Sequence, residues 1–156
     1  MTDPGRIAVA VGFVCSTLAF LLYILADLAR RRNRPSVGRL LRFARAGFTI
    51  AALASVFVFL QLMRLVVAKR FEYRYVFDYT SVDLHGAFLY AATWAGQEGS
   101  FALWAMLASL IGLLMTWKAG DWETRVMPVY ISHIAVLFAV LHILSPFVLV
   151  PKETGL

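Results

Sequence analysis

The segment Trp94-Ala-Gly-Gln-Glu-Gly-Ser-Phe-Ala-Leu-Trp104 begins a run of residues that stays apolar as far as Trp117. Gln97 and Glu98 therefore lie at the mouth of a hydrophobic span, where an uncompensated charge is costly and is usually kept for a function. At helical spacing, one face of this segment would carry Trp94, Glu98, Phe101 and Ala105, and the adjoining face Gln97, Ser100 and Trp104. The pattern predicts a carboxylate and an amide flanked by two indoles.

Two glycines in this segment, Gly96 and Gly99, lack the side chains that would keep another helix or a flat ligand at a distance. A plainer interpretation also stays open, in which a helix simply starts at the membrane interface. The aromatic residues would then mark the interface, Ser100 would lie near the helix cap, and the helix dipole would favour Glu98.

The composition of the whole chain is that of a membrane protein, with 61% hydrophobic residues and a mean hydropathy of +0.75. Four apolar runs reach the length of about 20 residues that a helix needs to cross a bilayer. We therefore predict an all-α, polytopic membrane protein with a single transmembrane domain over residues 1–156. Its four transmembrane helices are expected at residues 7–28, 46–68, 99–117 and 126–150.

The arginines predict the orientation of these helices. They concentrate in residues 29–45, which we expect to form a cytoplasmic loop that contacts anionic lipids, so both termini would lie outside. Residues 69–98 then form an external segment, an extended strip on the membrane surface followed by an interfacial helix at 84–93. The chain would be a multi-pass protein of the inner (plasma) membrane, with Trp94–Trp104 on the outer or periplasmic side. The formal charge of +6 does not indicate nucleic acid, because the arginines are not interleaved with an exposed aromatic surface.

Histidine is the residue type to consider for haem or metal, because neutral imidazole binds iron. His133 and His142 fall on the same predicted helix, but nine positions place them on opposite faces, so they cannot hold one metal together. His142, near the outer end, is the better candidate ligand, and His133 is expected to make a polar contact inside the bundle. His85 lies at the outer surface. The single cysteine, Cys15, is expected to be a small core residue.

The remaining polar residues give no catalytic motif. The chain has no Gly-x-Ser-x-Gly, phosphate loop, His-Glu-x-x-His or Cys-x-x-Cys sequence. Asp27 is expected to pair with the arginines that follow it, and Asp121 and Glu123 with the nearby Lys118 and Arg125. We expect no catalytic residues in this chain, and no metal site.

The quoted segment resembles the Trp-Gly-Gly-(His/Gln)-Glu-Gly-Ser-x-x-Leu-Trp signature of the CcmF family of cytochrome c biogenesis proteins, which is related to CcsA. Upstream, Tyr75-Val76 resembles the family's approach to this tryptophan, and downstream Ser145-Pro146-Phe147 resembles the end of its fourth helix. The resemblance covers residues 7–147, with Trp94–Trp104 as its specific motif. Ala95 replaces a usual glycine, and His85 stands where the family commonly has proline.

The resemblance implies haem handling and cytochrome c maturation. The family's tryptophan-rich Trp-Gly-x-x-Trp-x-Trp-Asp segment and its flanking external histidines do not occur in this sequence. The chain thus looks like an amino-terminal, four-helix portion, encoded separately or truncated, and not like a complete haem lyase. The implied cofactor is haem, and the implied partners are the remaining part of a CcmF-like lyase, other maturation proteins and apocytochrome c.

Two other functions stay open from the residues themselves. The chain could be a packing subunit of a transporter or respiratory membrane complex, using the same glycines and tryptophans as contact surface. It could also be a small haem b electron carrier, which would need His142 or His133 as an axial ligand.

Overall fold

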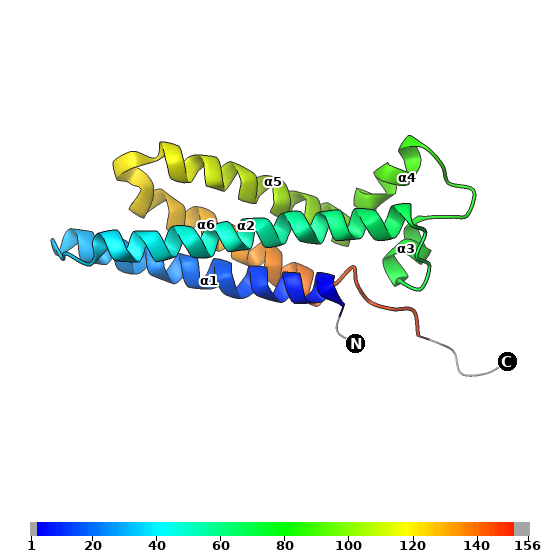
Figure 1. Ribbon diagram of the computed structural model, residues 1–156, viewed down its shortest axis with the longest axis horizontal. Helices are drawn as coiled ribbons and strands as arrows, with labels where there is room; N and C mark the ends of the chain where they lie inside the picture. Colours follow the sequence, from blue (N-terminus) through cyan, green and yellow to red (C-terminus); the bar gives the residue numbers. More distant parts are fainter. Residues whose placement is uncertain (1–2, 152–156) are drawn as a thin grey trace.

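Four long helices run side by side in alternating directions in the computed structural model, which describes residues 3–151 (Figure 1). The long helices are α1 (Pro4–Arg31), α2 (Val37–Val67), α5 (Gln97–Lys118) and α6 (Glu123–Ile143). The short ones are α3 (Arg74–Tyr79), α4 (Ala87–Ala91), η1 (Ala92–Trp94) and η2 (Gly120–Trp122). All four long helices are long and apolar enough to cross a membrane, which confirms the predicted all-α class with four transmembrane helices.

The two ends of the bundle differ in character. At one end, here called the arginine end, short turns join α1 to α2 and α5 to α6. At the other, the α3–α4 end, lie the start of α1 and the long connection between α2 and α5 (Figure 1). Within residues 3–151 the only β pairing is an isolated bridge at this end, between Tyr73 and Leu149.

The arginine-rich stretch is mostly helical, and the prediction of a loop over residues 29–45 was wrong. α1 continues to Arg31 and α2 begins at Val37, so only five residues connect them. Arginine is a good helix former, and its long side chain lets a helix continue beyond the apolar core into a polar layer. Asn33, with a φ of 48°, reverses the chain direction in this short turn.

The other predicted boundaries also shift. The fourth helix ends at Ile143 instead of residue 150, because Pro146 has no amide for a helical hydrogen bond and disfavours helix in the residue before it. The third begins at Gln97, close to the expected residue 99. The interfacial helix expected at 84–93 corresponds to α4 and η1. The expected external position of residues 152–156 lies outside the described part of the chain.

The extended strip expected after the second long helix is in part the helix α3. This helix buries Tyr75 and Val76 and leaves Phe77 exposed, so its burial does not follow the alternation that suggested a strip. Tyr73 and Thr80, on either side of α3, are extended. The segment after α6 packs against this region, where the Val148 carbonyl accepts a hydrogen bond from the Arg74 amide at 2.8 Å.

Small residues let the long helices approach closely, as is usual in membranes, where no hydrophobic force drives helices together. A side chain at Gly12 would place its Cβ 2.1 Å from the Phe138 ring of α6. At Gly112, a Cβ would lie 2.6 Å from Phe48 of α2. Buried alanines extend this packing along the bundle: Ala19, Ala26, Ala51, Ala52, Ala102 and Ala105.

A polar network ties three helices together at the arginine end. The buried Glu123 carboxylate accepts hydrogen bonds from the Tyr23 hydroxyl at 2.9 Å and from Arg45 Nε at 2.8 Å. Asp121 pairs with Arg30 at 2.5 Å, so the expected local pairs with Lys118 and Arg125 were wrong. Asp27 pairs with Arg31 at 2.7 Å, as predicted. The acidic residues before and at the start of α6 therefore pair with arginines from other helices instead of with residues near them in sequence, because α1 and α2 bring their arginines against this region.

Candidate functional site

The motif Trp94–Trp104 crosses a break between two helices. η1 ends at Trp94, Gly96 is the extended residue that precedes α5, and α5 begins at Gln97. Trp94 therefore does not share one helical register with Glu98, and the face predicted for these two residues was wrong.

Tyr75 of α3 anchors this break from outside the motif. Its hydroxyl lies 2.9 Å from the carbonyl of Thr93 and 3.1 Å from that of Ala92, and it accepts the amide of Gly96 at 3.1 Å. The side chain is only 3% exposed, and burial raises its pKa to about 12. The hydroxyl therefore stays protonated and able to donate. From the sequence, Tyr75 was notable only as part of the wider family resemblance.

The two glycines of the motif make room for α3. A Cβ at Gly96 would lie 2.4 Å from the Tyr79 ring, and one at Gly99 would lie 2.0 Å from the Thr93 carbonyl oxygen and 2.1 Å from the Tyr75 hydroxyl. The close approach predicted from these glycines is thus made by the chain's own tyrosines. Ser100 closes the same turn by donating to the Trp94 carbonyl at 2.8 Å.

Glu98 opens into a cavity that we call the Glu98 pocket. It has a volume of about 390 Å³ and lies among α3, the first turn of α5 and the chain that follows α6. Its polar lining residues include Arg74, Asp78, Tyr79 and Ser145. Glu98 Oε2 is buried and has no hydrogen-bond partner among the described residues. Arg74 is directed instead to Asp78, with Nε 3.5 Å from Oδ2.

A buried carboxylate oxygen without a partner is costly and calls for an explanation. The dipole of α5 favours a negative charge in its first turn, but it supplies no hydrogen bond to this atom. The Glu98 pocket is therefore suited to receive a hydrogen-bond donor or a cation.

The two tryptophans do not flank Glu98. Trp94 is exposed and is not among the residues that line the Glu98 pocket. Trp104 is also exposed and belongs to another cavity, farther along α5. Gln97 is exposed on the first turn of α5. The motif thus divides into a glycine turn, the Glu98 pocket and an exposed indole at each end.

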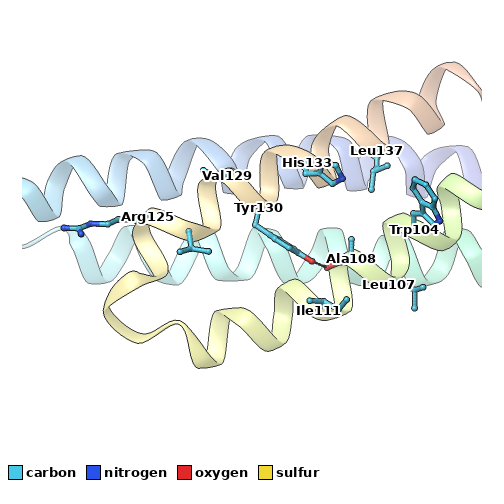
Figure 2. A pocket seen from close by; sticks show the side chains of 10 residues that line it. Trp104, Leu107, Ala108, Ile111, Arg125, Val129, Tyr130, His133 and Leu137 are labelled. Atoms are coloured by element: carbon cyan, nitrogen blue, oxygen red, sulfur yellow. Dashed lines mark hydrogen bonds between the residues drawn. The ribbon is translucent and has the colours of Figure 1, made fainter.

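The second cavity, the α5–α6 groove, has a volume of about 820 Å³ (Figure 2). It is lined by Trp104, Leu107, Ala108, Ile111, Arg125, Val126, Val129, Tyr130, His133 and Leu137. The Tyr130 hydroxyl donates to the Ala108 carbonyl at 2.8 Å across the floor of the groove. This groove was not predicted from the sequence, because its apolar residues look like any other lipid-facing surface.

The histidines are all exposed. His133 lines the α5–α6 groove, so the prediction that it lies inside the bundle was wrong. His142 is exposed on the last turn of α6, and His85 is exposed before α4. Within residues 3–151, no three His, Cys, Asp or Glu side chains come together in a way that could hold a metal ion.

The comparisons with known proteins point to one protein. No family model and no curated protein matches the sequence. A solved structure titled Cytochrome c Heme Lyase CcmF matches with a TM-score of 0.81 and 30% identity over 96% of this chain. The chain spans 25% of the length of that protein. The predicted resemblance to a CcmF-type amino-terminal portion is therefore confirmed.

Proposed function

We propose that this chain is a membrane subunit of cytochrome c maturation that acts as the amino-terminal part of a CcmF-like haem lyase. The fold match over nearly the whole chain supports this proposal, and so does the motif around Glu98. In this proposal the partner is the remaining part of the lyase, which carries the tryptophan-rich segment and the external histidines. Apocytochrome c and other maturation proteins would act on the assembled lyase.

The proposed orientation places the α3–α4 end outside, where cytochrome c is matured, and the arginine end in the cytoplasm. The arginine end carries seven exposed arginines within ten residues of the α1–α2 turn: Arg30, Arg31, Arg32, Arg34, Arg39, Arg42 and Arg45. Such a concentration favours the cytoplasmic side and anionic lipids.

The Glu98 pocket does not fit haem as a resident group. Its lining contains no histidine, cysteine or methionine that could serve as an axial ligand, and most of its side chains are polar or charged. In the proposed function, Glu98 instead accepts a hydrogen bond from the rest of the lyase and fixes its position, while the exposed Trp94 offers an aromatic face to haem or to the partner. The observation that carries this role is the buried, unpaired Oε2 atom.

Measuring holocytochrome c yield tests the role of Glu98. Glu98→Ala is expected to lower the yield about tenfold, the effect of losing one charge-assisted hydrogen bond, while the amount of inserted protein stays unchanged. Trp94→Ala should also lower the yield. Glu72→Ala is the matched control, because Glu72 is half exposed and pairs with Arg70 in the same segment. Normal yields from both Glu98→Ala and Trp94→Ala would refute the role of the motif in haem handling.

Labelling with a membrane-impermeant thiol reagent tests the orientation. In a chain with Cys15→Ser, a cysteine introduced at the exposed Val82 should react from outside the cell, and one at the exposed Ser36 should react only after the membrane is opened. The reverse pattern would put the Glu98 pocket on the cytoplasmic side and contradict the proposal.

A further inference from the structure

We propose that the α5–α6 groove is the seat of a transmembrane helix from the partner chain, with His133 as its hydrogen-bonding contact. This inference rests on the proposed function, because the partner is the chain that supplies the rest of the lyase. It concerns a surface that lies away from the Glu98 pocket and requires no part of the motif turn.

His133 lies where an exposed imidazole is hardest to explain. It is ten residues from either end of α6, which spans Glu123–Ile143, so at about 1.5 Å per residue it lies about 15 Å from each end. That depth is the middle of a bilayer core about 30 Å thick. Polar and ionisable side chains at such a depth almost always face protein or a water-filled cavity, because lipid offers them no hydrogen bond.

The other outer faces of the bundle have the apolar character expected of a surface that contacts lipid. Along α1 the exposed face between the ends reads Val11, Phe13, Val14, Leu18, Leu21 and Leu25. On α2 the exposed Thr49 donates its hydroxyl to the Arg45 carbonyl of its own helix. Among residues 3–151, His133 has no hydrogen-bond partner, and no other ionisable side chain is exposed in the middle of a long helix.

The groove has the shape that a helix needs. Its lining runs along α5 from Trp104 to Ile111 and along α6 from Arg125 to Leu137, so it follows both helices over several turns (Figure 2). The small Ala108 is among its lining residues, and the Tyr130 side chain reaches from α6 to the Ala108 carbonyl of α5. In the close view, Trp104, His133 and Tyr130 all lie along this opening between the two helices (Figure 2). A small residue such as Ala108 lets another helix approach α5 closely at this point.

Charge favours a different chain over a second copy of this one. Two copies related by a twofold axis along the membrane normal would meet with the same residues at the same depth. Arg125 of each would then lie near Arg125 of the other at the arginine end of the groove. A partner helix can instead carry an apolar surface, a hydrogen-bonding group opposite His133, and an acidic or polar residue near Arg125.

Photo-crosslinking in the protein's own membranes tests this assignment. A benzophenone side chain at Val129, which is 74% exposed in the groove, should give an adduct whose sequenced peptide is an apolar, membrane-length segment of the chain that carries the lyase's tryptophan-rich region. The matched control is Val14 on α1, which is 53% exposed and should give only lipid adducts. Lipid adducts alone at Val129, an adduct to a second copy, or an adduct to any other chain would overturn the proposal.

Two pairs of variants test the role assigned to His133 and to the shape of the groove. His133→Leu should lower the Val129 adduct yield about threefold to twentyfold, the range found for a lost hydrogen bond between membrane helices, whereas His133→Gln should keep it within about twofold. Trp104→Ala would widen the groove and therefore cannot block it. The blocking variant is Ala108→Phe, and its matched control is Ala10→Phe on α1. Ala108→Phe alone should abolish the adduct.

The result is separable from the test of the proposed function. Holocytochrome c yield reports on the lyase, and the identity of the Val129 adduct reports on the groove. A chain that matures cytochrome c but gives only lipid adducts at Val129 would keep its proposed function and lose this docking site. A chain with no effect of Glu98→Ala or Trp94→Ala would lose the proposed role of the motif, whatever Val129 contacts.

Discussion

Replacing Gly99 with alanine should loosen the connection between η1 and α5. The new Cβ would lie 2.0 Å from the Thr93 carbonyl oxygen and 2.1 Å from the Tyr75 hydroxyl. The tyrosine must withdraw to relieve the second contact, and the backbone at Thr93 must shift to relieve the first. Its donated and accepted hydrogen bonds are worth about 2 kcal/mol together, and leaving the buried Gly96 amide unpaired adds about 1 kcal/mol. The higher helix propensity of alanine offsets about 1 kcal/mol of this loss. These terms leave a cost of about 2 kcal/mol, to which the shift of the Thr93 backbone adds.

Hydrogen exchange measures this cost where it arises. A local loss of about 2 kcal/mol speeds exchange of the Gly96 amide and the first turn of α5 about thirtyfold if these groups open together. Gly38→Ala is the matched control, because a Cβ at Gly38 has no atom within 4 Å. That variant should leave exchange in this region unchanged.

A double-mutant cycle with Tyr75→Phe separates the proposed cause from a general loss of packing. Tyr75→Phe removes the hydroxyl alone, so it should produce much of the same effect. Once Gly99→Ala has displaced the tyrosine, however, removing the hydroxyl should cost little more. Additive effects in the double variant, or wild-type exchange in Gly99→Ala, would refute the claim that the glycine exists to admit Tyr75.

Two further outcomes follow from the contacts. Glu123→Ala should destabilise the protein in detergent by about 2 kcal/mol, because the buried Tyr23 hydroxyl loses its acceptor and the half-exposed Arg45 loses its ion pair. Asp121→Ala should cost less than about 1 kcal/mol, since the Asp121 side chain is 93% exposed. Equal thermal unfolding of the two variants would contradict the network. Raising the pH should loosen the α3–α4 end, because burial raises the pKa of Tyr75 to about 12 from an ordinary value of about 10. The stability from its protonated hydroxyl is complete below pH of about 10 and is lost as the pH rises towards about 12. Exchange at Gly96 should show this transition in the wild type and lose it in Tyr75→Phe.

Hydropathy was sufficient to predict the class of fold, because spans of the length found here leave few structures open to a chain in lipid. Local pattern was not sufficient for the ends of the helices. Arg39 and Arg42 were expected in a loop because charge and loop usually go together, yet they belong to α2, which projects beyond the apolar core. α6 ends before Pro146 because the residue that precedes a proline disfavours the helical conformation, and the helix ends a few residues earlier than expected.

The site was predictable only in part, since its parts come together from distant segments. The motif singled out Glu98 and Gly99, but nothing local indicates that Tyr75, 24 positions before Gly99, fills the space the glycine leaves. His133 was expected inside because polar side chains in membrane helices usually face protein. That rule holds for complete assemblies. In the single chain His133 is instead exposed in the α5–α6 groove, which marks this groove as a surface that a partner could cover.

The polar groups of this bundle are satisfied unevenly, and the pattern has a direction. At the arginine end, Glu123 meets Tyr23 and Arg45, so α1, α2 and α6 close on one another without outside help. Among residues 3–151, the buried atoms Glu98 Oε2, Thr93 Oγ1 and Ser109 Oγ have no hydrogen-bond partner, and neither has the exposed His133. Of these residues, Glu98 and His133 face cavities bordered by α5 and by α6 or the chain that follows it. The outer faces of α1 and α2, in contrast, are largely apolar between their ends, and the exposed Thr49 hydroxyl donates to its own helix, so both faces are suited to lipid. A single partner lying along α5 and α6 could reach both unsatisfied groups at once. Two contacts on one rigid partner reinforce each other. If one partner makes both contacts, removing Glu98 and His133 together should weaken its binding by no more than the product of the two separate losses. If two independent partners make them, each substitution should lower only the crosslinking yield of the partner that it contacts.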